Sequence, residues 1–264
     1  MRILLKWGDE YGMKWGAHKT QRMSMRYNNC RAKDPPRILF DGNDIKSGDT
    51  LETLGVLLNK GGIGYAHLSK VRRKIAGIRI MVAKNYRIRT QRILEMIYTT
   101  YIMPHINYCS SQWNTNVEAH LRGIDIELKR FWKLSQTRLR PSNIMGLQEQ
   151  LIFNDLKQVH KIKHDKSTIK FDDIFEMSEH QKRTDEKIHP KKYKKKFAQH
   201  SFGRRVQKYW NLLPLDVREM KREKFKTEIK DLMINEKKAH KRQKMLNFGL
   251  AKPIKLDPPG IYER

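Results

Sequence analysis

The chain has little of what a secreted or membrane-spanning protein needs. Cysteine occurs only at Cys30 and Cys109 in 264 residues, which excludes a disulfide framework and a four-thiolate zinc site. No apolar run approaches the roughly 18 residues of a membrane-spanning helix. Lys6 interrupts the apolar opening, so the N-terminus does not resemble a signal peptide. We therefore expect a soluble, intracellular protein, nuclear or cytoplasmic and not secreted, with no membrane partner.

Acidic residues are also scarce. The chain has 56 Lys and Arg against 28 Asp and Glu, which gives a net charge of +28. Such an excess repels itself in a compact state unless a polyanion screens it, and each cation set against a phosphate releases a condensed counterion. Nucleic acid is therefore the expected partner.

Two stretches contain no acidic residue at all. They lie between Glu52 and Glu95 and between Glu186 and Asp216. A solvated helix face usually mixes charges, because Glu and Lys four residues apart stabilise a helix. These stretches favour contact with a polyanion, and an ordinary solvated face remains the alternative. The run 191–196 is equally typical of a nuclear import signal or a linker.

The apolar pattern predicts an α+β, mostly α fold. Residues 11–27 indicate two strands around Gly16, residues 37–45 a hairpin turning at Asp41 and Gly42, and residues 49–59 one strand that passes Gly55. From residue 65 onward the apolar spacing changes to three and four, which is typical of helices. Helices are expected from 65, over about 90–112, and around 121–135, 147–162, 201–210 and 225–232.

The first of these helices has a distinct charge pattern. Its apolar residues fall on one face, and the basic residues fall away from that face. The apolar set is Leu68, Val71, Ile75, Ile78 and Val82. We expect the cations here, with two from the second acid-free stretch, to contact phosphates. The expected nucleic-acid-binding residues are Lys60, Lys70, Arg72, Arg73, Lys74, Arg79, Lys84, Arg204 and Arg205.

Proline, serine and aromatic residues refine the helix assignments. Pro104 should kink or break the second helix, Ser201 should cap a later one, and Pro214 should stop it. Aromatic residues on or near the apolar stripes are expected to be structural rather than stacking platforms for bases. They are Tyr98, Tyr101, Trp113, Trp132 and Trp210.

The sequence contains no convincing catalytic constellation. The glycine-rich segment 61–67 lacks the Lys and Ser/Thr of a phosphate-binding loop. His105 and Cys109 lie four residues apart without enough further thiolates for zinc, and Asp172 and Asp173 indicate a surface acidic pair. We expect no bound metal and no cofactor for this chain by itself.

Four segments of the chain form a recognisable series. They are GMKWGAHKT (12–20), ILFDGNDI (38–45) with TLGVLLN (53–59), ILEMIYTTYIMPHINYCSSQWN (93–114) and SFGRRVQKYWNLLP with VRE and FK (201–226). In this order they resemble the C-terminal part of a non-LTR retrotransposon reverse transcriptase of the LINE or jockey type. The first resembles the palm segment after the catalytic aspartates, and the second, with His67, resembles the primer grip. The third resembles a helix ending in Pro and Trp-Asn, and the fourth a terminal Arg…Trp-Asn-x-Leu-Pro element.

The resemblance implies a domain order. Residues 1–62 would form the palm end and primer-grip β region, 63–164 a helical thumb-like domain, 165–200 a basic linker, 201–235 a C-terminal helical element and 236–264 a loose basic tail. Leu54 and Gly55 would position the primer terminus. The β region would expose Leu54, Val56 and Leu58 if it lacks a complete palm to pack on.

The resemblance also implies nucleic-acid binding without polymerase activity. Lys19 matches a palm lysine, but the aspartate clusters that hold Mg²⁺ in the full-length enzyme would lie upstream of residue 1, and Gly16 stands where the family usually has Asn. We expect the part of an RNA-directed DNA polymerase that holds primer and template. It would bind RNA, RNA–DNA duplex or DNA with little base specificity and would have no polymerase activity alone.

Two alternatives remain open on the sequence. The chain could act as a polymerase when a longer product or a partner chain supplies the palm. It could instead be a basic nuclear or nucleolar structural RNA-binding protein unrelated to polymerases. The sequence predicts no oligomeric state.

Overall fold

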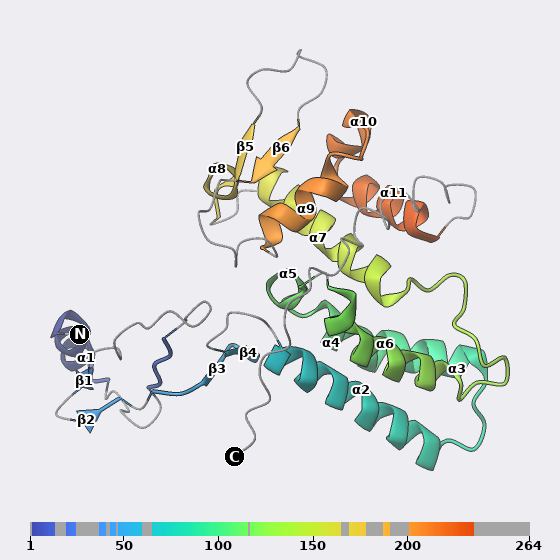
Figure 1. The fold of residues 1–264 in the computed structure, drawn as a ribbon, viewed down its shortest axis with the longest axis horizontal. Helices are drawn as coiled ribbons and strands as arrows, with labels where there is room; N and C mark the ends of the chain where they lie inside the picture. The colour runs from blue at the N-terminus through green and yellow to red at the C-terminus, as the bar shows by residue number, and fades with distance from the viewer. Residues whose placement is uncertain are drawn as a thin grey trace. The chain divides into compact units, whose positions relative to one another are not determined.

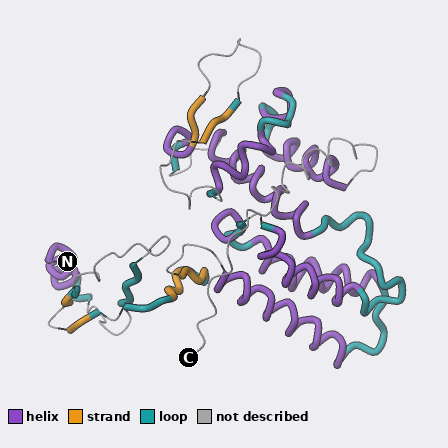
Figure 2. The backbone as a smooth tube through the Cα atoms, viewed as in Figure 1, coloured by secondary structure: helices purple, strands orange, loops and turns teal. Residues whose placement is uncertain are grey.

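The structure is a computed structural model that describes residues 2–13, 20–24, 37–40, 43–45, 47–59, 65–115, 117–164, 169–177, 187–190 and 201–234. The described chain is mostly helical, with small two-stranded antiparallel sheets (Figures 1 and 2). This confirms the expected α+β, mostly α class. The chain divides into two units, Met1–His67 and Leu68–Arg264. Among the described helices, none has the length and apolar character to span a bilayer.

The first unit begins with a helix, α1 (Arg2–Glu10), which the sequence pattern did not indicate. The two strands expected over 11–27 are wrong for the described residues 11–13 and 20–24, where only an isolated bridge from Arg22 to Ser47 occurs. The expected hairpin over 37–45 is confirmed, since β1 (Leu39–Phe40) pairs with β2 (Asn43–Asp44). Its turn residues Asp41 and Gly42 lie outside the described residues.

The single strand expected over 49–59 is wrong. The segment forms a hairpin in which β3 (Thr50–Thr53) pairs with β4 (Val56–Asn59), and the two strands are joined by Leu54 and Gly55 alone. Both linking residues have positive φ, 46° and 78°, as a two-residue hairpin turn that matches strand twist requires. Of the three side chains expected to be exposed, only Leu54 is fully so; Val56 is buried and Leu58 is half-buried.

In the second unit, α2 (Tyr65–Asn85) is the first long helix. Its stripe lies in the protein interior as expected, because Leu68, Val71, Ile75 and Val82 are buried and Ile78 is half-buried. α6 (Glu118–Trp132) likewise buries Leu121, Ile124, Leu128, Phe131 and Trp132. Both helices therefore follow the one-sided burial that their apolar spacing predicts.

The helix expected over 90–112 consists of several pieces. α3 (Gln91–Ile97) continues into a π-helical segment, η2 (Tyr98–Ile102), and then α4 (Met103–Asn107). Pro104 opens α4, so the π-helical turn precedes the residue that cannot donate a backbone hydrogen bond. The helical path ends at Tyr108 and at Cys109, whose φ is 48°, before the short α5 (Ser110–Trp113).

A central helix, α7 (Leu147–His164), packs against both earlier and later helices of the second unit. It contacts α4 and α5 on one side and α9 (Phe202–Trp210) and α11 (Arg222–Ile234) on the other (Figure 1). It shares one apolar core with these C-terminal helices, in which Leu156 and Val159 meet Trp210 and Phe225. The expected boundary between 164 and 201 therefore does not separate two cores.

The expected linker 165–200 contains regular structure where it is described. α8 (Phe171–Ile174) leads into β5 (Phe175–Met177), which pairs with β6 (Ile188–Pro190). Ser201 occupies the N-cap position of α9 but makes no capping hydrogen bond. The helix ends at Trp210, before Pro214, and the short α10 (Leu215–Arg218) follows.

Candidate nucleic-acid interface

The exposed side of α2 carries cations and no carboxylate. Arg72, Arg73 and Lys74 form a consecutive exposed group, and Lys84 is exposed in the last turn. Among the described residues, none of these four cations forms an ion pair with an acidic side chain. Lys70 is half-buried and has a partner of its own. We call the set Arg72, Arg73, Lys74 and Lys84 the α2 basic surface.

Arg79 differs from the other cations of α2. Its Nε lies 3.0 Å from Oε2 of Glu127 on α6, and Arg130 Nη1 lies 2.7 Å from the other carboxylate oxygen. Burial raises the pKa of Glu127, but hydrogen bonds and charge from Arg79 and Arg130 outweigh it and lower the pKa overall. Arg79 therefore joins α2 to α6 through an ion pair, and its expected role as a phosphate contact stays a prediction.

Arg72 also lies against α6. A Cβ added at Gly123 would stand 3.1 Å from Arg72 Cδ, so the aliphatic part of this arginine passes over the glycine. Gly123 and Glu127 are four residues apart on α6 and therefore share a face. Arg72 and Arg79 thus both contact one face of α6, and Arg72 keeps an exposed side chain.

Other cations of the first acid-free stretch have structural roles. Arg89 donates from Nε to the carbonyl of Tyr86 at 2.7 Å and from Nη2 to that of Ala83 at 3.0 Å. Ala83 lies in the last turn of α2 and Tyr86 directly follows the helix, so the arginine stands at the C-terminal end, where a positive charge is favourable to the helix dipole. The sequence pattern did not indicate this cap.

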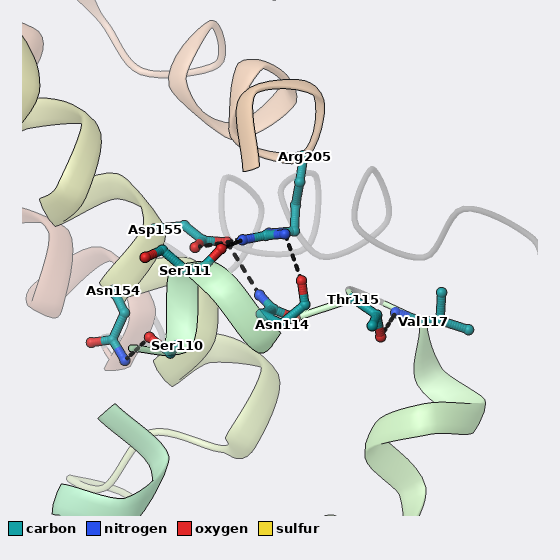
Figure 3. A network of polar contacts seen from close by, with 8 residues as sticks. All are labelled: Ser110, Ser111, Asn114, Thr115, Val117, Asn154, Asp155 and Arg205. Carbon is teal, nitrogen blue, oxygen red and sulfur yellow. Dashed lines mark hydrogen bonds and ion pairs between the residues drawn. The ribbon is translucent and has the colours of Figure 1, made fainter. Parts of the chain in front are cut away.

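Arg205 is a buried structural residue, which corrects the expectation that it binds nucleic acid. Its side chain is 3% exposed, and Nε and Nη2 donate to the two oxygens of Asp155 on α7 at 2.6 and 3.0 Å (Figure 3). It also donates to the backbone carbonyls of Asn114 and Ser111. With its donors directed at four protein oxygens, this guanidinium cannot meet a phosphate. Arg204, beside it, is half-buried and keeps its candidate role.

The Arg205 pair belongs to a polar network that fixes α5 against α7. Asn114 donates to Asp155 at 3.2 Å, and Asn154 donates to Ser110 at 3.1 Å and to Asn107 at 2.9 Å. Burial raises the pKa of Asp155, and the charge of Arg205 opposes this rise. The sequence signal for this network was the pair Asn154 and Asp155, two polar residues between the apolar Phe153 and Leu156.

The remaining expected site residues have mixed outcomes. Lys19, Lys60 and the run 191–196 lie outside the described residues. Leu54 and Gly55 occupy a hairpin turn instead of a strand, with Leu54 at 87% exposure. No group of three metal-binding side chains occurs in the described parts of the chain.

The aromatic residues are structural with one exception. Tyr98, Trp113, Trp132 and Trp210 are buried, as expected, but Tyr101 is 55% exposed. Trp113 donates from its indole to the carbonyl of Tyr108 at 2.7 Å, which satisfies its polar atom inside the fold. Tyr101 is the member of this set that retains a surface on which a base could stack.

Comparison with known proteins gives no match. No protein-family model, no curated protein and no solved structure is significantly similar to the chain.

Proposed function

We propose that this chain binds RNA, or an RNA–DNA duplex, through backbone phosphates with little base specificity and without polymerase activity of its own. In this proposal it corresponds to the part of a non-LTR reverse transcriptase that holds primer and template. The observation that carries the proposal is the division of α2 into a buried apolar stripe and an exposed basic surface with no acidic residue on the helix.

The dimensions of α2 suit a nucleic-acid backbone. Lys70 to Lys84 cover fourteen residue steps, or about 21 Å at a rise of 1.5 Å per residue. A duplex carries one phosphate charge per roughly 1.7 Å of its axis, so this part of the helix passes about a dozen phosphates. Several of the exposed cations can therefore contact phosphates at the same time.

The arrangement on α6 supports an interface that includes both helices. Glu127 is shared by Arg79 and Arg130, so these three side chains together keep one net positive charge. Arg130 remains more than half exposed at its side chain. The buried carboxylate thus orients two guanidinium groups beside the α2 basic surface and neutralises only one of their two charges.

The salt dependence of binding tests the proposal. The affinity for an RNA duplex whose strand ends carry hydroxyl groups is measured over a range of salt concentrations. The proteins compared are the wild type and a triple variant, Arg72→Glu, Arg73→Glu and Lys74→Glu. Each phosphate contact contributes about 0.9 to the slope of log K against log salt. We expect the triple variant to reduce the magnitude of the slope by about 2 to 3.

A matched variant controls for net charge. Lys221→Glu, Lys224→Glu and Lys230→Glu make the same change in charge at exposed positions in or just before α11. This control should leave the slope close to that of the wild type. Equal slopes for the wild type and the α2 variant would contradict the proposal.

A further inference from the structure

A pocket in the second unit combines positive charge with neutral hydrogen-bonding groups. It has a volume of about 450 Å³ and is lined by Asn107 of α4 and by residues of α5, α7 and α11. α7 packs against both α5 and α11. Asn107, Ser110 and Asn154 contribute neutral polar groups to its wall. A volume of this size accommodates a small ligand.

Four cations line this pocket, and none of the described lining residues is acidic. Lys157 and Lys161 come from α7, and Arg222 and Lys226 come from α11. Glu223, which does not line the pocket, accepts from Lys226 at 2.6 Å and is 81% exposed at its side chain. The four lining cations outnumber this carboxylate, and Arg222 has a further partner of its own.

The arrangement of these cations costs stability when the pocket is empty. Each helix carries its two cations four residues apart, a spacing at which like charges destabilise a helix. Burial lowers the pKa of Lys157, and the charges of Lys226 and Arg222 lower it further. A bound anion would offset the repulsion between these cations.

We propose that this pocket binds a phosphate monoester, carried by the end of a nucleic-acid strand or by a free mononucleotide. A monoester carries a charge of −1.5 to −2 at neutral pH and offers three acceptor oxygens. The lysine and arginine groups match this charge, and charge-assisted hydrogen bonds to phosphate are among the strongest in proteins. The site is separate from the α2 basic surface and does not depend on it.

Binding of matched ligands tests this proposal on the full chain. Short RNA oligonucleotides of one sequence carry a 5′-phosphate, a 3′-phosphate or hydroxyl ends, and adenosine monophosphate and adenosine form the second pair. If strand ends are the ligand, one phosphorylated oligonucleotide binds on the order of tenfold more tightly than the hydroxyl form. If a free nucleotide is the ligand, the monophosphate binds and adenosine does not, while the oligonucleotides bind equally.

Substitutions of the pocket residues test whether the pocket causes the preference for phosphorylated ligands. Lys157→Gln with Arg222→Gln should abolish the preference for phosphate, and Lys161→Gln alone should reduce it. The matched control Lys224→Gln with Lys230→Gln, on the same helix but outside the pocket, should preserve it. Removal of like charges should leave the melting temperature of the pocket variants equal or higher, so lost binding would not reflect unfolding.

Two outcomes would overturn the inference. One is that the wild type binds all three oligonucleotides equally and also binds adenosine monophosphate no better than adenosine. The other is a double pocket variant that keeps the full preference. The charge-reversed α2 variant should weaken all oligonucleotides alike and leave the phosphate preference unchanged, so failure here is distinguishable from failure of the proposed function.

Discussion

Removal of Arg205 should destabilise the second unit strongly, because its partner would remain buried. Asp155 is fully inaccessible at its side chain and receives two hydrogen bonds from the guanidinium, at 2.6 and 3.0 Å. In Arg205→Met, the hydrogen bond from Asn114, 3.2 Å long in the intact protein, is the one that Asp155 keeps among the described side chains. An uncompensated buried charge of this kind costs about 3–5 kcal/mol, a large fraction of the 5–15 kcal/mol that stabilises an ordinary domain.

A double variant separates the charge from the packing. Arg205→Met combined with Asp155→Leu removes both ions, and replacing a buried ion pair by apolar groups is often neutral or better. The carbonyls of Asn114 and Ser111 would still lose their donors, at about 1–3 kcal/mol for each group left buried. We expect the double variant to be more stable than Arg205→Met by at least about 2 kcal/mol.

Urea unfolding followed by circular dichroism at several pH values measures these differences. Burial raises the pKa of Asp155, and Arg205→Met removes the charge of Arg205, which lowers that pKa in the intact protein. A carboxyl group whose folded-state pKa is raised destabilises the fold at higher pH, so the deficit of Arg205→Met should shrink as the pH falls. A loss below about 1 kcal/mol, or a double variant as unstable as the sum of the single ones, would refute the reasoning.

Two further substitutions test smaller features of the fold. Glu127 has a lowered folded-state pKa, so its contribution to stability is present at neutral pH and is lost as the pH falls through that lowered pKa. The melting temperature of Glu127→Gln should therefore lie below that of the wild type at pH 7 and approach it under acid conditions. A constant difference across the pH range would contradict this. Leu54 is exposed at a φ of 46°, a conformation that asparagine adopts more readily, so Leu54→Asn should stabilise the β3–β4 hairpin by about 0.5–1 kcal/mol and slow amide exchange within it. Faster exchange would show that the leucine side chain supports the hairpin.

Local patterns in the sequence predicted the elements whose burial is one-sided. The spacing of Leu68, Val71, Ile75 and Val82 predicted α2 and its buried face, because a helix that packs on one side needs apolar residues every three or four positions. The Asp-Gly pair at 41–42 similarly predicted the β1–β2 hairpin. Leu54 with Gly55 lacks that signal, and the β3–β4 turn was missed for this reason.

The role of each cation could not be predicted in the same way. Arg79 and Glu127 are 48 residues apart, and Arg205 and Asp155 are 50 apart, so their pairing depends on helix packing. Absence of nearby acidic residues in the sequence therefore does not mean absence of a partner. The burial of α7 could not be predicted from local spacing either. This helix buries residues on more than one side because it lies between α5, α9 and α11.

Lysine footprinting with and without an RNA duplex tests the central claim most directly. The chain is acetylated at low reagent concentration, and the rate of modification is read at each lysine by mass spectrometry. We expect the duplex to slow modification of Lys74 and Lys84, which are exposed on α2, and to leave the exposed Lys224 and Lys230 on α11 unchanged. Equal rates at Lys74 and Lys84 with and without bound duplex would contradict the account.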